Sequence, residues 1–227
     1  MTHLWSEFLT NQGRSVQKWT HYFPAYERHF GRYVNRPCTL LEIGVASGGS
    51  LQLWKRWLGP MARIVGVDIH PACARFEEHQ VSVRIGSQAD TAFLDSLLAE
   101  FGPFDMILDD GSHHQADVAT SFAHLYPRMA REGCYMVEDL HAAYWPEYGG
   151  GLRHPASFLE TCKNLLDELN AHWTRGAIPP TPFTDTTVSM HFYDSIVAFE
   201  RGRLPPRIGP QVPPNQVKEL RPENFSG

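Results

Sequence analysis

Long apolar runs, paired cysteines and an excess of charge are all missing from this sequence. No run approaches the roughly 18 apolar residues of a membrane-spanning helix. The start, MTHLWSEFLTNQG, lacks the basic and apolar stretches of a secretory signal. The cysteines show no CxxC spacing, which favours free thiols in a cytoplasmic protein over a disulfide framework; they are Cys38, Cys73, Cys134 and Cys162.

The charge balance argues against two classes of partner. With 20 Lys and Arg against 25 Asp and Glu, the formal net charge is −5. No general electrostatic attraction to nucleic acid or to an anionic membrane is therefore expected. The 227 residues, 42% of them hydrophobic, suit one α/β domain with a sizeable core.

Strand-like and helix-like stretches alternate along the chain. An apolar run from Leu40 to Val45 predicts a first strand, and further strands are expected at 63–69, 81–86, 104–110 and 134–140. Helices are expected at 51–58, 91–102, 113–133 and 155–173, and two β-rich runs at 186–202 are separated near Asp194. This alternation predicts a doubly wound, mostly parallel sheet, closed by an antiparallel pair. Ligands of such sheets bind beyond the carboxyl ends of the strands.

Three segments are predicted. Residues 1–36, with aromatic residues at helical spacing, form an N-terminal helical segment that packs on the core. Residues 37–202 form the domain itself, and residues 203–227, rich in proline, form an extended tail. The aromatic helices and the tail offer surfaces to a partner subunit, so a homo-oligomer is expected.

The first strand leads into LEIGVASGGS, which is typical of a nucleotide-like cofactor site. Small residues let the backbone approach a ligand closely, and the next helix N-terminus offers free N–H groups. Ala46 stands where the dinucleotide fingerprint has its second glycine, and Glu42 precedes Gly44 by two residues. A turn of this composition with an acidic residue two positions before its first glycine is typical of S-adenosylmethionine methyltransferases of the Rossmann-like class. Candidate cofactor residues are Glu42, Gly44, Ala46, Ser47 and Gly48, then Asp68 for the ribose hydroxyls, and Ser87, Gln88 and Asp90 near the adenine, where a solvated loop is the alternative.

Carboxylates gather at the ends of two further strands. ILDDGSHH brings Asp110 to the end of the fourth strand, and VEDLH brings Glu138 and Asp139 to the end of the fifth. These strands are neighbours in the usual order of such sheets, so the three side chains would repel one another without a cation. Oxygen ligands favour Mg²⁺, Mn²⁺ or Ca²⁺ over zinc. The alternative is that Glu138 or Asp139 caps a turn while Asp110 is solvated.

LEIGVASGGS, VGVDI, ILDDGSHH and VEDLH, in this order, resemble the metal-dependent sugar O-methyltransferases of antibiotic biosynthesis, the mycinamicin VI, demethylmacrocin and rhamnosyl-tetracenomycin O-methyltransferase type. HYFPAYERHF, AAYWPEYGGG and HFYDSIVAFERG are also similar to that family, over most of residues 18–202. The resemblance implies a class I methyltransferase fold with a seven-stranded sheet, a C-terminal antiparallel hairpin and N-terminal helices. It implies S-adenosylmethionine and magnesium as cofactors and a glycoside as substrate. The implied magnesium ligands are Asp110, Glu138 and Asp139, and the implied general base is His113.

Methyl transfer to a sugar needs a proton acceptor, because a sugar hydroxyl hardly ionises near neutral pH. A metal lowers the pKa of the hydroxyl, and a histidine with a pKa near 7 accepts the proton. His113, three residues after Asp110, suits this role, whereas packing roles are expected for His114 and His141. Two roles stay open for Asp109, a contact with the cofactor's amino group or with neighbouring backbone.

Aromatic residues mark the expected substrate entrance. Tyr144, Trp145 and Tyr148 suit stacking on a sugar face or an aglycone, and Gly149 to Gly151 permit lid movement; packing of the loop is the alternative. Residues of the N-terminal segment form the other pocket wall or, for the tyrosines, a helix core: Lys18, His21, Tyr22 and Tyr26.

Two other functions stay open. The same cofactor and metal could serve a catechol or another non-sugar acceptor. Such sites often employ a lysine base, and no lysine is expected near these strand ends. A dehydrogenase or a non-catalytic nucleotide-binding protein is the third hypothesis, and the incomplete dinucleotide fingerprint argues against it.

Overall fold

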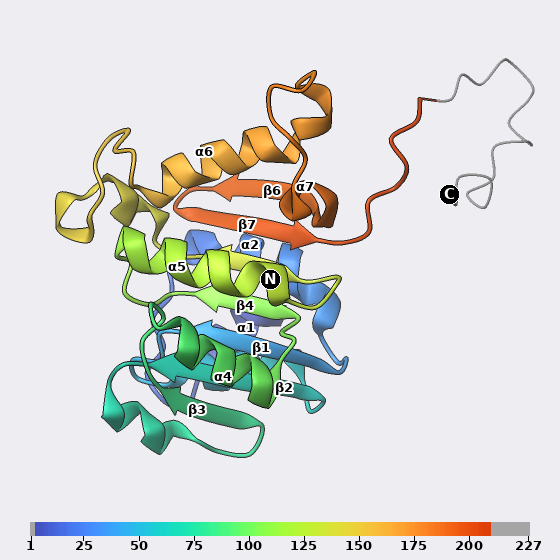
Figure 1. The fold of residues 1–227 in the computed structure, drawn as a ribbon. Helices are drawn as coiled ribbons and strands as arrows, with labels where there is room; N and C mark the ends of the chain where they lie inside the picture. The colour runs from blue at the N-terminus through green and yellow to red at the C-terminus, as the bar shows by residue number, and fades with distance from the viewer. Residues whose placement is uncertain (1–2, 210–227) are drawn as a thin grey trace, which may run out of the picture.

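The computed structural model describes residues 3–209, and within them one sheet of seven strands has the order β3-β2-β1-β4-β5-β7-β6 (Figure 1). The five strands β1 to β5 are parallel, and β7 and β6 are antiparallel additions beside β5. The predicted fold class, hairpin included, is confirmed. The strands are β1 Cys38–Ile43, β2 Ala62–Asp68, β3 Val81–Ile85, β4 Met106–Asp109, β5 Cys134–Val137, β6 Thr187–Tyr193 and β7 Ile196–Arg201.

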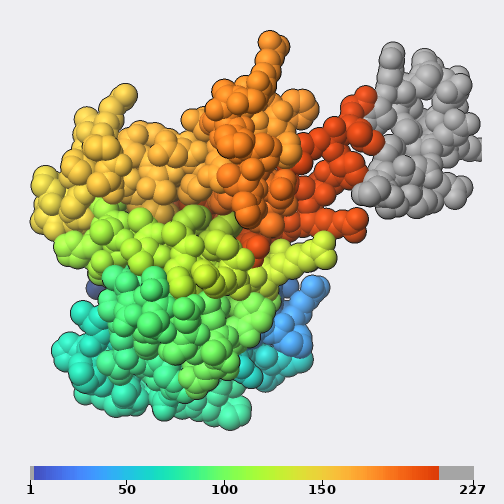
Figure 2. Space-filling model, viewed as in Figure 1, coloured from blue at the N-terminus to red at the C-terminus, as the bar shows by residue number. Residues whose placement is uncertain are grey.

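Helices cover both faces of the sheet and bury it from both sides. Strand residues alternate between two cores, so Leu40 faces one and Leu41 the other. One core includes α1 (His3–Leu9), α2 (Phe23–Phe30) and α3 (Gly49–Leu58); the other includes α4 (Thr91–Phe101), α5 (Gln115–Leu125) and α6 (Phe158–Leu169), with α7 (Pro182–Thr186) beside it. Figure 2 shows this second face, where the green to orange parts of the chain hide most of the blue N-terminal part. Short 3-10 turns lie at Thr20–Tyr22, Gly31–Tyr33, Pro71–Phe76, Tyr126–Arg128, Leu140–Tyr144, Pro146–Tyr148 and Ala171–Trp173.

The N-terminal segment is not helical throughout, so the prediction of a helical segment over residues 1–36 was wrong in its middle. Residues 11–19, which we call the strap, contain no helix. The Asn11 side chain bonds the backbone of Gly13 and Arg14 and turns the chain there. The strap then crosses the start of α3 so closely that a Cβ on Gly49 would lie 2.0 Å from the carbonyl oxygen of Ser15.

Two later helices are shorter than predicted. The helix expected at 113–133 ends at Leu125, because Pro127 lacks the backbone N–H that a continuing helix needs, and a 3-10 turn follows. The helix expected at 155–173 spans Phe158–Leu169, since Ser157 caps its N-terminus by accepting a hydrogen bond from the Glu160 amide.

All four cysteines are free, as expected, and the structure buries each of them. In the part of the chain from residue 3 to 209, no helix has both the length and the apolar character needed to cross a membrane. Of the predicted tail, residues 203–209 form neither helix nor strand, and residues 210–227 lie outside the described part.

Candidate active site

The chain order of the sheet reverses at β1, which lies between β2 and β4. Ligands of doubly wound sheets bind in the crevice beyond the strand ends at this point. Two cavities of about 420 and 200 Å³ lie there, and Gly44 and Gly111 line both, so the cavities adjoin. The larger one is enclosed by the strap, by the turn after β1 and by the residues that follow β4 and β5.

The turn after β1 requires glycine at Gly44. This residue has a φ of +98°, and a Cβ there would lie 1.9 Å from the carbonyl oxygen of Asp110. The backbone of the turn therefore touches the segment that leaves β4. Any displacement of Gly44 would move Asp110 as well.

Asp68, at the end of β2, holds the same turn in place. Its Oδ2 accepts hydrogen bonds of 3.0 Å from the amides of Val45 and Ala46, and its Oδ1 accepts one of 2.8 Å from the His70 amide. Partial burial disfavours the ionised form, but these three bonds outweigh it and keep the pKa of Asp68 below its usual value. Asp68 is therefore a carboxylate that lines the smaller cavity.

The other predicted cofactor residues lie around the two cavities or beneath them. Ser87 and Gln88 line the smaller cavity, and Ala46 and Ser47 line the larger one. Gly48, with a φ of +70°, precedes α3, and Glu42 is buried with its Oε2 accepting a hydrogen bond of 3.0 Å from Ser50. Asp90 instead caps α4, where its Oδ1 accepts bonds from two backbone amides.

Asp109 has neither of the two roles considered for it. It is fully buried and lines neither cavity. Its carboxylate accepts side-chain hydrogen bonds of 3.0 Å from Gln88, 2.7 Å from Ser121 and 2.9 Å from Tyr135. Asp109 therefore ties β4 to α5 and β5 on the side of the sheet away from the strap, because alternate residues of a strand face opposite sides.

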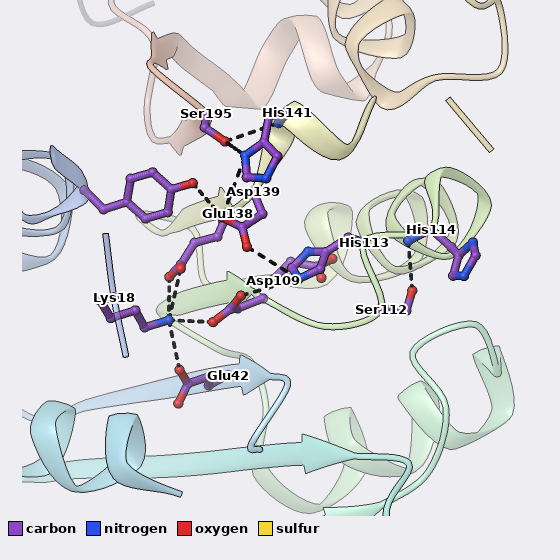
Figure 3. A network of polar contacts seen from close by, with 12 residues as sticks. Lys18, Glu42, Asp109, Ser112, His113, His114, Glu138, Asp139, His141 and Ser195 are labelled. Carbon is purple, nitrogen blue, oxygen red and sulfur yellow. Dashed lines mark hydrogen bonds and ion pairs between the residues drawn. The ribbon is translucent and has the colours of Figure 1, made fainter. Parts of the chain in front are cut away.

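Asp110, Glu138 and Asp139 lie directly after β4 and β5, and His113 lies beside them (Figure 3). The Nε2 atom of His113 is 3.8 Å from Asp110 Oδ1 and 3.7 Å from Asp139 Oδ2. Ligand atoms of Asp110, His113 and Asp139 all fall within 4.8 Å of one another, a spacing that suits one metal ion. Glu138 is outside this group, because its carboxylate faces Lys18.

Lys18, on the strap, reaches the same strand ends. Its Nζ donates hydrogen bonds of 2.6 Å to Asp110 Oδ2 and of 2.8 and 3.0 Å to the two oxygens of Glu138, and it lies 3.7 Å from Glu42 Oε1. The expectation that no lysine lies near the strand ends was therefore wrong. Lys18 precedes Asp110 by 92 residues, and only the folded strap brings the two together.

The protonation of these groups follows from burial and from their charges. Burial alone would lower the pKa of Lys18, but Asp110, Glu138 and Glu42 raise it well above its usual value, so Lys18 is an ammonium and no proton acceptor. Burial, and next the charge of Asp110, raise the pKa of Glu138 to about 8 against the effect of Lys18. Burial raises that of Glu42 to about 7. Three acidic groups, Asp110, Glu138 and Glu42, thus surround the Lys18 ammonium, and a divalent cation bound beside Asp110 would favour their ionised forms.

Two contacts around Asp139 have no clear signal in the sequence. Tyr22 donates a hydrogen bond of 2.6 Å to Asp139 Oδ1. The Oγ of Ser195, at the tip of the β6–β7 hairpin, lies 2.5 Å from Nδ1 of His141, and that nitrogen is 4.0 Å from Asp139 Oδ1. Both tyrosines were expected in the pocket wall or in a helix core. Tyr22 is buried and also bonds Asp139, and Tyr26 belongs to the core. His141 is oriented by Ser195, and His114 is exposed and points away from the carboxylates (Figure 3).

The aromatic segment after β5 lies beside the histidines. The ring of Tyr148 is centred 6.4 Å from that of His113, and the ring of Trp145 is 4.7 Å from that of His141. Tyr144 and Trp145 are exposed, and neither cavity is lined by Tyr144, Trp145 or Tyr148. These side chains therefore form an open surface next to the carboxylates rather than a closed pocket.

The fold, the glycine-rich turn and the strand-end carboxylates together define a class I methyltransferase domain. Residues 41–140 match the family model described as a methyltransferase domain. The solved structure of the MycE methyltransferase from the mycinamycin biosynthetic pathway, in complex with Mg, SAH and mycinamycin VI, is similar with a TM-score of 0.75 and 34% identity, over 88% of this chain and 53% of that one.

Within this class the chain is similar to sugar O-methyltransferases of antibiotic pathways. It is 34% identical over 211 residues to the 8-demethyl-8-(2-methoxy-alpha-L-rhamnosyl)-tetracenomycin-C 3'-O-methyltransferase of Streptomyces olivaceus, covering 88% of this chain and 54% of the relative. It is 37% identical over 197 residues to the mycinamicin VI 2''-O-methyltransferase of Micromonospora griseorubida, covering 81% and 49%. The chain thus spans about half the length of these relatives.

Proposed function

We propose that this chain is an S-adenosylmethionine- and Mg²⁺-dependent O-methyltransferase that methylates a sugar hydroxyl of a glycosylated natural product or glycan. The observation that carries the proposal is the meeting of Asp110, Asp139 and His113 within 4.8 Å, directly beside the cavity of the glycine-rich turn. A cofactor site and a cation site that share one wall are what metal-assisted methyl transfer requires.

The cofactor fits the two adjoining cavities. Asp68, Ser87 and Gln88 line the smaller one and offer groups for an adenosine. The larger one joins the glycine-rich turn to the carboxylates and suits the sulfonium end. The close backbone approach at Gly44 supports this placement, because a larger residue there would meet Asp110.

The proposed metal ligands are Asp110, Glu138 and Asp139, and a bound divalent cation would supply Lewis acidity to the acceptor hydroxyl. Tyr22 orients Asp139 through its hydrogen bond. His113 takes the proton of the acceptor at its Nε2 atom, which faces the Asp110 and Asp139 carboxylates. The aligned oxygen, methyl and sulfur supply much of the remaining rate enhancement, since positioning contributes up to about 7–11 kcal/mol.

Removal of divalent cations is expected to abolish methyl transfer to sugars. The test supplies labelled S-adenosylmethionine with rhamnosides, other deoxysugar glycosides and catechols, in EDTA and after addition of Mg²⁺. Label in a sugar only with Mg²⁺ supports reaction and metal together. Transfer that is insensitive to EDTA would remove the metal from the proposal, and transfer to catechols alone would favour the non-sugar acceptor. Tight binding of NAD without S-adenosylhomocysteine, by calorimetry, would overturn the methyltransferase assignment.

Replacement of His113 with alanine is expected to lower kcat by roughly 10²–10⁴-fold, because a positioned base contributes about that much. The matched control is His114→Ala, which removes the adjacent, exposed histidine. Both variants are compared with the wild type in Mg²⁺ across a pH series. A His113→Ala variant as active as His114→Ala would show that another group accepts the proton.

Tyr144, Trp145 and Tyr148 remain the proposed contacts for the sugar or aglycone, since Tyr148 and Trp145 lie beside His113 and His141 and Tyr144 is exposed in the same segment. The cytoplasmic location and the homo-oligomeric state expected from the sequence also stay predictions. Nucleic acid and membranes are not proposed as partners, in line with the net charge of −5.

A further inference from the structure

We infer that Lys18 is a positioning residue that competes with the divalent cation for Glu138, and so sets how tightly the site holds metal. This inference rests on the proposed function, because it concerns the cation of that same site. The carboxylate oxygens at the ends of β4 and β5 form two groups, one that faces Lys18 and one that faces His113.

The first group faces Lys18. Both oxygens of Glu138 accept hydrogen bonds from Nζ, at 2.8 and 3.0 Å, and Asp110 Oδ2 accepts one at 2.6 Å. The second group faces His113 and consists of Asp110 Oδ1 and Asp139 Oδ2, at 3.8 and 3.7 Å. Asp110 uses one oxygen for each group, so the ammonium and a metal bound between Asp110 and Asp139 would be neighbours.

Glu138 cannot serve both cations fully. The atoms within 4.8 Å of one another belong to Asp110, His113 and Asp139, and Glu138 is not among them. For Glu138 to join this group, its carboxylate must turn from Lys18 toward His113, which lengthens its hydrogen bonds to Nζ. The side chains of Lys18 and Glu138 are 2% and 3% exposed, so water replaces lost contacts poorly and the exchange is costly.

The strap makes Lys18 a cation fixed to the wall of the cofactor cavity. Ser15 to Trp19 line that cavity beside Gly44 to Ser47, and Arg14 anchors the strap by a 2.9 Å bond from its amide to the Gln52 side chain and a 3.0 Å ion pair with Glu78. A change in the contacts of Lys18 therefore alters a segment that lines the proposed cofactor cavity and also bonds the proposed metal ligands.

The test measures thermal unfolding of Lys18→Met, Lys18→Arg and wild type, each in EDTA and in saturating Mn²⁺, with Mn²⁺ affinity by calorimetry. Methionine has a similar length and no charge, so the variant is expected to lose stability in EDTA and regain most of it in Mn²⁺. Its metal-induced rise in Tm should exceed that of the wild type by roughly 5 °C or more. Arginine binds a carboxylate through two parallel hydrogen bonds. Lys18→Arg should therefore show a smaller metal-induced rise in Tm and a weaker Mn²⁺ affinity than the wild type.

Lys163→Met is the control, because Lys163 pairs with Glu160 on α6, away from the strand ends and from the strap. Its metal-induced rise should equal that of the wild type. Equal losses for Lys18→Met in EDTA and in Mn²⁺ would make Lys18 purely structural, and a smaller metal-induced rise would make it a helper of metal binding; either result overturns the inference. If Lys18→Met does not fold in either condition, Lys18→Arg decides alone, and an unchanged rise there overturns it too. A wild type without any Mn²⁺ response would instead refute the metal in the proposed function.

Discussion

Asparagine in place of Asp110 is expected to lower kcat for methyl transfer by roughly a thousandfold, while the protein stays folded. The substitution keeps the size of the side chain and removes the negative charge of Asp110, which attracts both Lys18 and the proposed cation. Metal assistance is worth several kcal/mol, and each ~1.4 kcal/mol is a factor of ten in rate. The rate is measured at saturating S-adenosylmethionine and Mg²⁺ with the best sugar acceptor.

Two comparisons make this result specific. The affinity for S-adenosylhomocysteine should change little, because Asp68 rather than Asp110 holds the glycine-rich turn. Asp95→Asn removes an exposed carboxylate that pairs with His124, and a surface pair of this kind is worth little, so its rate should be that of the wild type. If Asp110→Asn kept more than a tenth of the wild-type rate, Asp110 would not be a metal ligand.

Alanine in place of Gly44 is expected to lower the free energy of unfolding by about 2–5 kcal/mol and to remove activity at any acceptor concentration. The backbone strain of a positive φ and the overlap of a Cβ with a carbonyl oxygen add together. The overlap is with Asp110, at 1.9 Å, so the chain can relieve it only by moving a proposed metal ligand. Urea unfolding and Mn²⁺ calorimetry measure the two effects separately.

Two other glycines separate strain from overlap. Gly149 has a φ of +75° with nothing within 4 Å of a built Cβ, so Gly149→Ala should show the strain alone, about 1 kcal/mol. Gly31 has a φ of −58° and equally open surroundings, so Gly31→Ala should be close to neutral. If all three variants had similar stability, the overlap with Asp110 would not contribute to the loss in Gly44→Ala.

Residues at strand ends could be predicted from the sequence because local patterns define strands. The apolar run before Asp110 and the run before Glu138 each predict a buried strand, and neighbouring parallel strands end at the same edge. The same reasoning placed Asp68 at the end of the second strand, in the same cofactor site as Gly44. Their proximity therefore follows from the order of the strands alone.

Lys18, Tyr22 and Ser195 could not be placed in this way. Lys18 lies on a strap whose path is fixed by contacts of Arg14 with the distant residues Gln52 and Glu78, and no periodic pattern encodes those contacts. Ser195 reaches His141 only because β7 pairs with β5. The two adjacent aspartates could not be told apart from the sequence either. Asp109, the last residue of β4, faces α5, whereas Asp110 faces the crevice, and which of the two faces the crevice depends on the residue at which the strand ends.

The strap has a consequence for how the protein is made. Lys18 is synthesised 120 residues before its partner Glu138, and β5 is enclosed only when β7 has been added. Contacts between residues this far apart slow folding, because loop closure must precede the gain from pairing. A nascent chain leaving the ribosome therefore carries an unmatched lysine until almost the whole domain has emerged. Assembly of the carboxylate cluster is accordingly a late event, and a chain truncated before β7 should not complete it.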